Sequence, residues 1–241
     1  SGLLLDLKVS ERDLTWTEYI RHKYDNYSSI SFKVFIEKFE KLCIDKNSLD
    51  GRIHLHAEKA MWFLTSTDRE FRDTTTKAIY YYGMSYFDEY YKIVKYSLKI
   101  NDPYVKERML ASLYGVALSK INGEKKNNFK EKILPDIAIE LYKLMFKHGA
   151  PHSTTHIIIR DYARRIIELA LIYKPKTLNN TQQKKFRPPY KTEGLKKWGE
   201  SDYEHKDYSY DGPIQMDFSN YTIGTLVPNG HSYANPPEKI K

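Results

Sequence analysis

The sequence is poor in the features of disulfide-stabilised, secreted or membrane-spanning proteins. Its single cysteine, Cys43, excludes an internal disulfide and favours a reducing compartment, so we expect a cytoplasmic location. No apolar run approaches the roughly 20 residues of a bilayer-spanning helix, which predicts a soluble protein without membrane contact. The chain starts with Ser1 and Gly2 and lacks a secretory signal, so we interpret it as an expression fragment with a tag scar, for which a longer parent polypeptide is one possible source.

Motifs that bind nucleotides or zinc are also missing. There is no phosphate-binding loop in which glycines flank four residues before Lys and Ser or Thr, no dinucleotide-binding glycine pattern and no pair of CxxC motifs. No local pattern singles out an acid and base pair among the 31 acidic residues. We therefore predict no catalytic residue and no cofactor, while a hydrolase site assembled from distant residues stays open as an alternative.

Five histidines are the candidate metal ligands, and one cysteine is the candidate nucleophile. The histidines concerned are His54, His56, His148, His152 and His156. Gly149 and Pro151 break any helix through the second group, and alternating positions such as those of the first group diverge on a helix. We interpret all five as surface or boundary histidines rather than a metal site. Cys43 lies beside an apolar stripe with no motif tying it to a base, so a buried structural thiol is favoured over a nucleophile.

What the sequence does contain is apolar residues repeated every three or four positions, which is typical of amphipathic helices. About eight helices are expected before residue 174, with the regular segments at 15–24, 32–42, 57–64, 67–83, 87–98, 103–116, 135–145 and 153–173. The signals expected to start or stop them are Thr15 with Glu18, Thr67 with Glu70, Gly83, Asp102 with Pro103, and Gly149.

A weak internal similarity accompanies the helices. The pairs Arg72 with Asp73 and Arg160 with Asp161 stand at comparable helix starts, and Arg108 holds a similar position between them. The arginines are 36 and 52 residues apart, loosely the period of paired-helix repeats with one insertion. We predict an all-α fold, a right-handed α-α superhelix of HEAT-like repeats in which these residues link neighbouring repeats. Coincidental charged helix starts are the alternative.

The chain changes character after residue 173. From Lys174 to Glu200 it has eight Lys or Arg against two Glu, several prolines and no helical stripe, which predicts an exposed loop. We expect a helical-repeat domain at 1–173 and an irregular tail at 174–241 that packs partly on the helices, with short strands as an alternative.

The formal charge of +8 favours anionic partners, and one stretch concentrates basic side chains. Phe186, Tyr190 and Trp198 are interleaved with its basic residues, a mixture that can neutralise phosphates and stack on bases. The candidate contacts to nucleic acid or another anion are Lys184, Lys185, Arg187, Lys191, Lys196 and Lys197. An ordinary solvated loop is the alternative.

Four segments resemble a known family. They are Arg72–Ile79 (RDTTTKAI), Asn101–Leu118 (NDPYVKERMLASLYGVAL), Ile159–Leu169 (IRDYARRIIEL) and Asp217–Pro228 (DFSNYTIGTLVP). Together they resemble the helical-repeat region of large bacterial signal-transducing P-loop ATPases of the NACHT or STAND type, associated with antiviral defence. The resemblance implies a recognition region coupled to an ATPase core elsewhere, and it transfers no catalytic residue because the ATPase motifs are missing here.

These observations predict a non-catalytic module that binds a protein partner, acting as a sensor or scaffold inside a larger bacterial signalling or defence ATPase. A nucleic-acid-binding helical module that uses the basic and aromatic stretch is the alternative.

Overall fold

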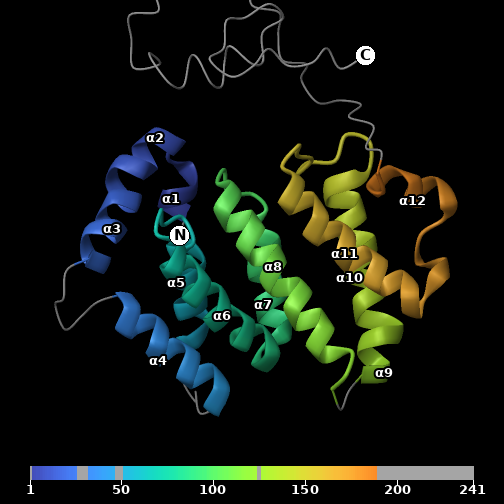
Figure 1. The fold of residues 1–241 in the computed structure, drawn as a ribbon, viewed down its shortest axis with the longest axis horizontal. Helices are drawn as coiled ribbons and strands as arrows, with labels where there is room; N and C mark the ends of the chain where they lie inside the picture. The colour runs from blue at the N-terminus through green and yellow to red at the C-terminus, as the bar shows by residue number, and fades with distance from the viewer. Residues whose placement is uncertain (1, 26–31, 47–50, 124–125, 189–241) are drawn as a thin grey trace, which may run out of the picture. The chain divides into compact units, whose positions relative to one another are not determined.

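The computed structural model describes residues 2–25, 32–46, 51–123 and 126–188, and within these ranges the protein is all-α without a strand. The elements are α1 (Gly2–Asp6), α2 (Val9–Arg12), η1 (Asp13–Thr17), α3 (Glu18–Asp25), α4 (Phe32–Asp45), α5 (Ile53–Phe63), α6 (Arg69–Ser85), α7 (Phe87–Ser97), α8 (Pro103–Lys120), α9 (Lys126–Asn128), η2 (Phe129–Ile133), α10 (Leu134–Leu141), η3 (Tyr142–Phe146), α11 (Ile157–Tyr173), η4 (Pro175–Thr177) and α12 (Asn180–Phe186) (Figure 1).

Helices α4, α6, α8 and α11 pack one against the next, although other helices separate them in the sequence (Figure 1). Contacts between α6 and α8 show that these two run in the same direction. Near their starts, the guanidinium of Arg72 lies 4.0 Å from the ring centre of Tyr104. Near their ends, the hydroxyl of Tyr80 lies 2.9 Å from that of Ser119. Early residues of one helix therefore meet early residues of the other.

The same parallel arrangement joins α4 to α6. Lys77 forms a 2.7 Å ion pair with Glu40, and eight residues later on α6 the hydroxyl of Ser85 donates a 2.7 Å hydrogen bond to the carbonyl of Cys43. Two parallel helices that follow each other in the sequence require a return segment between them. Helix α5 connects α4 to α6, α7 connects α6 to α8, and the run from α9 to η3 leads from α8 to α11.

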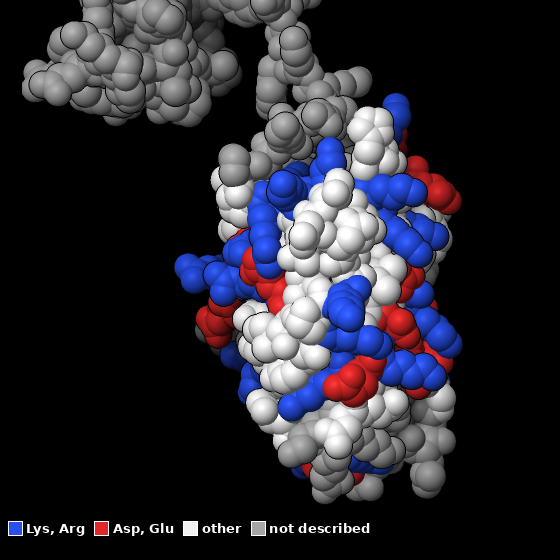
Figure 2. Space-filling view, turned by 90° about the vertical axis from the view of Figure 1, so that its right-hand side faces the viewer, with Lys and Arg blue, Asp and Glu red and all other residues white. Residues whose placement is uncertain are grey.

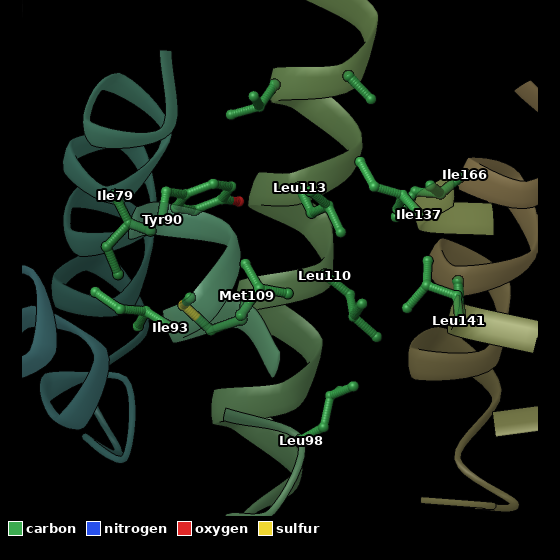
Figure 3. Packing of buried hydrophobic residues seen from close by; sticks show 14 of the residues in the cluster. Ile79, Tyr90, Ile93, Leu98, Met109, Leu110, Leu113, Ile137, Leu141 and Ile166 are labelled. Carbon is green, nitrogen blue, oxygen red and sulfur yellow. The ribbon is translucent and has the colours of Figure 1, made fainter. Parts of the chain in front are cut away.

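Helix α8 lies at the centre of the core and buries side chains on two sides. Met109 extends towards Tyr90 and Ile93, whereas Leu110 extends the opposite way, towards Leu141 of α10 (Figure 3). The single apolar stripe expected from the sequence captured only part of this surface. A helix enclosed by neighbours on two sides loses the amphipathic pattern on which that expectation depended.

The expected interruption at Gly83 is wrong, because α6 continues through Gly83 to Ser85. A β-carbon at this glycine would lie 2.8 Å from Cγ2 of Val116 and 2.9 Å from the ring of Tyr90. The glycine therefore allows α6 to approach α7 and α8 closely inside a continuous helix, and does not end the helix.

Two of the expected helix signals are confirmed. Asp102 begins α8, its Oδ1 accepting hydrogen bonds from the amides of Tyr104 (2.9 Å) and Val105 (3.3 Å), with Pro103 at the first helical position. Gly149 follows η3 with a φ of +69°, the left-handed conformation that glycine adopts without steric cost.

Two expected helix starts are wrong. The cap of α6 is Asp68 rather than Thr67, since its Oδ1 accepts the amide of Phe71 at 2.6 Å. Thr15 lies inside a helical run that begins at Val9, and its hydroxyl donates to the carbonyl of Glu11 at 2.7 Å. Ser, Thr and Asp share the capping chemistry, so composition alone does not choose between adjacent candidates.

The helix expected to begin near Pro135 belongs to a helical run that starts at Lys126. The π-helical turn η2 ends two residues before Pro135, and the amide of Leu134 donates to the carbonyl of Phe129 five residues earlier. This wider turn accommodates the missing amide proton of proline, which would otherwise break an α-helix.

Candidate functional site

Arg72 and Arg160 make the same contact at two helix starts. Each is the fourth residue of its helix, α6 or α11, and each is 7% exposed. Nη1 of Arg72 donates to the carbonyl of Ser66 at 2.5 Å, and Nη1 of Arg160 donates to that of Thr154 at 2.9 Å. Both carbonyls lie six residues upstream, in the loop before the helix. The guanidinium thus ties each loop to its own helix, and we call this contact the arginine clamp.

The remaining residues of the expected inter-repeat group divide into two kinds. Arg108 of α8 forms an ion pair with Asp73 of α6, so this pair joins two stacked helices. Asp161 instead pairs with Arg164 and Arg165 of its own helix, at 2.5 Å each. The structure therefore brings Asp73 and Arg108 together, whereas the ion pairs of Asp161 stay within α11.

A third buried arginine holds the loop before α8, and sequence reasoning missed it. Arg12 of α2 is 2% exposed, and its Nη2 donates to the carbonyl of Asn101 at 2.9 Å and pairs with Asp102 at 3.3 Å. Burial raises the pKa of Asp102, while Arg12 and the two capped amides oppose that shift. The partners are 90 residues apart, so no local sequence signal could have revealed the contact.

The two arginine clamps are expected to contribute equally to stability. Arg72→Met and Arg160→Met each keep most of the buried side-chain volume and remove one charge-assisted hydrogen bond, so each should lower the unfolding free energy by about 1.5 kcal/mol. Urea unfolding followed by circular dichroism measures this. Arg69→Met, which alters a highly exposed residue on α6, is the control and should change stability by less than about 0.5 kcal/mol. A clamp variant as stable as the control would contradict the role.

Two of the candidate metal-binding histidines, His54 and His156, have structural partners. Nδ1 of His54 lies 2.6 Å from the hydroxyl of Tyr82, and Nδ1 of His156 accepts the amide of Ile159 at 3.4 Å at the start of α11. In the described part of the chain, no three His, Cys, Asp or Glu side chains come together as a metal would require.

Cys43 is fully buried in α4, and its burial, together with the nearby Glu40, raises the pKa of the thiol from 9.0 to about 12. Because the thiolate is the reactive form, we expect no labelling of native protein by Ellman's reagent at pH 8 and complete labelling in 6 M guanidinium chloride. Reaction of the native protein within minutes would show that the thiol is accessible.

The basic stretch is partly helical, so the expectation of an exposed loop is wrong for residues 180–186. There α12 packs on η3, with the rings of Phe186 and Phe146 at 5.9 Å and Phe186 fully buried. The helix has a capping box formed by Asn179 and Gln182, which sequence reasoning also missed. Only one apolar residue, Phe186, lies in this seven-residue helix, so the sequence shows no helical periodicity there.

The packing of α12 on η3 brings together basic residues that are distant in the sequence. We define the basic surface as Lys143, Lys147, Lys184, Lys185 and Arg187. Figure 2 views the protein from the side of α12, where blue Lys and Arg side chains, with red Asp and Glu side chains among them, lie around an uncharged patch. The other predicted anion contacts, Lys191, Lys196 and Lys197, lie outside the described residues, as do Tyr190 and Trp198.

Acidic residues next to the basic surface already have cationic partners. Glu168 pairs with Arg164 at 2.7 Å and with Arg187 at 3.6 Å. In contrast, Lys143, Lys147 and Lys184 are exposed and form no ion pair with any described residue. These three lysines are therefore available to pair with an anionic partner.

None of the described helices is both long enough and apolar enough to cross a bilayer. Comparison of the chain with protein-family models, with curated proteins and with solved structures found no match.

Proposed function

We propose that this chain is a non-catalytic binding and scaffold module that holds a protein partner. Its stacked helices would form a right-handed α-α superhelix of HEAT-like repeats. The observation that carries the proposal is that α4, α6 and α8 run parallel side by side, with α11 packed next in order. Stacked helices of repeat proteins present extended surfaces that bind other macromolecules.

The arginine clamps support the repeat interpretation. The same residue type, at the same helix position, bonds to a carbonyl the same distance upstream in α6 and α11. Charged helix starts alone would not produce matching buried contacts. The loop before α8 is held by Arg12 instead, so an inserted or diverged unit would separate the two matching ones.

The wider setting of this module rests on the sequence resemblance. Three of the four similar segments lie on α6, α8 and α11, the helices that stack. We therefore place the module in a larger bacterial signalling or defence ATPase, as its recognition region. The ATP-binding motifs would lie elsewhere in that protein.

The proposal is tested by affinity capture from nuclease-treated bacterial lysate, followed by cross-linking and mass spectrometry. We expect a protein partner whose cross-links concentrate on α4, α6, α8 and α11. The Gly83→Val chain, in which a branched side chain would separate α6 from α8, is the matched bait and should lose that partner. Recovery of the bait chain alone, or equal capture by both baits, would contradict the proposal.

A further inference from the structure

We infer that the basic surface on η3 and α12 binds the phosphate backbone of nucleic acid without reading its base sequence. This function goes beyond the proposed protein partner and uses a different part of the molecule. It is argued from the distribution of charge, from the partners of each charged group and from the burial of the nearest aromatic ring.

The excess positive charge of the chain is confined to about a quarter of its residues. Residues 126–188 contain thirteen Lys or Arg and five Asp or Glu, a net charge of +8, equal to that of the entire sequence. All other residues together are therefore neutral. Charge concentrated on one side attracts an anionic polymer far more strongly than the same charge spread evenly.

The local acids do not cancel this charge. Glu168 and Asp161 are paired with arginines of α11 and with Arg187, which follows α12, so they are already neutralised. Lys143, Lys147 and Lys184 have no acidic partner among the described residues. Exposed lysines without an acidic partner can neutralise the charges of a phosphate polymer, which then releases its counterions.

The face of α12 borders a solvent-open hollow of about 660 Å³. Apart from the apolar Pro188, the side chains that line the hollow can all donate hydrogen bonds, and none of them is acidic. The donors are Asn180, Thr181, Gln183, Lys184, Lys185 and Arg187. Amide, hydroxyl and cationic donors are the groups that contact phosphate oxygens in protein complexes with nucleic acid. These donors suit a phosphate backbone, while most of the surface that lines the hollow is apolar.

Burial of Phe186 removes the base stacking that the sequence suggested at this position. The ring packs against Phe146 and has no exposed surface, so it offers no platform for a base. Contacts through phosphates alone position a protein on nucleic acid without conveying sequence. Binding should therefore depend on salt and not on sequence.

The test is fluorescence anisotropy with labelled 20-nucleotide single strands and duplexes of two unrelated sequences, from 50 to 200 mM NaCl. If about four phosphates are neutralised, affinity should fall roughly 100-fold over this range, equally for both sequences. Combining Lys143→Glu, Lys147→Glu and Lys184→Glu should abolish binding at 50 mM salt.

The control combines Lys33→Glu, Lys38→Glu and Lys41→Glu, which changes the net charge equally through exposed lysines of α4. It should bind like the wild type, and circular dichroism should show both variants folded. No binding by the wild type, equal loss in both variants, or a salt-independent affinity would overturn the inference. Binding to polyglutamate but not to nucleic acid would overturn it too and leave the proposed protein partner standing, because lysate capture tests that separately.

Discussion

Arg12→Met is expected to lower the free energy of unfolding by about 3 kcal/mol, the largest single effect we predict. Removing one member of a buried ion pair leaves the other charge without compensation, which costs about 3–5 kcal/mol. Here Asp102 is 8% exposed and would lose its guanidinium, and the carbonyl of Asn101 would lose its donor. Urea unfolding of the wild type and variant, followed by circular dichroism, measures the difference.

A double-mutant cycle with Asp102→Asn separates the ion pair from the helix cap. Asparagine keeps a capping oxygen for the amides of Tyr104 and Val105 but removes the charge. The loss of unfolding free energy in the double variant should therefore be smaller than the sum of the losses in the two single variants, by about 1–2 kcal/mol. Additive effects, or a loss below about 1 kcal/mol for Arg12→Met, would show that the contact between α2 and α8 is not a stabilising one.

Gly83→Ala and Gly115→Ala are expected to change stability in opposite directions, with a difference of about 3 kcal/mol between them. A new methyl group at Gly83 would lie within 3.0 Å of Val116 and Tyr90, both fully buried, and should cost about 2 kcal/mol net. At Gly115 the nearest atom is in the ring of Tyr80 at 3.4 Å, an ordinary contact. Alanine there should stabilise the helix by up to about 1 kcal/mol.

Thermal and urea unfolding of both variants check this prediction, and each variant is the control of the other because both substitutions lie inside helices of the same stack. If Gly83→Ala were stabilising, α6 and α8 would have to be separated by more than the structure shows. The mutual spacing of these helices, and with it the proposed superhelix, would then need revision.

The candidate site shows where sequence reasoning succeeded and where it stopped. Arg72 and Arg160 could be singled out because both stand before an aspartate at a helix start, and the structure gives them the same buried contact. Lys184, Lys185 and Arg187 could be found by local charge density. Lys143 and Lys147 could not, because they join the basic surface only through the packing of Phe146 against Phe186. Such contacts between distant segments leave no local pattern.

The sequence by itself determined the helical character of most described residues between 15 and 173, since the recurrence of apolar residues every three or four positions is a property of the chain and needs no partner. It also determined the start of α8 at Asp102 and the turn at Gly149, because capping and a left-handed φ depend on single residues and their neighbours. Tertiary structure decided which helices stack, why α6 continues through Gly83 and why Arg12 is buried. These outcomes depend on atoms brought together from distant positions, and their energies arise only once the core has formed.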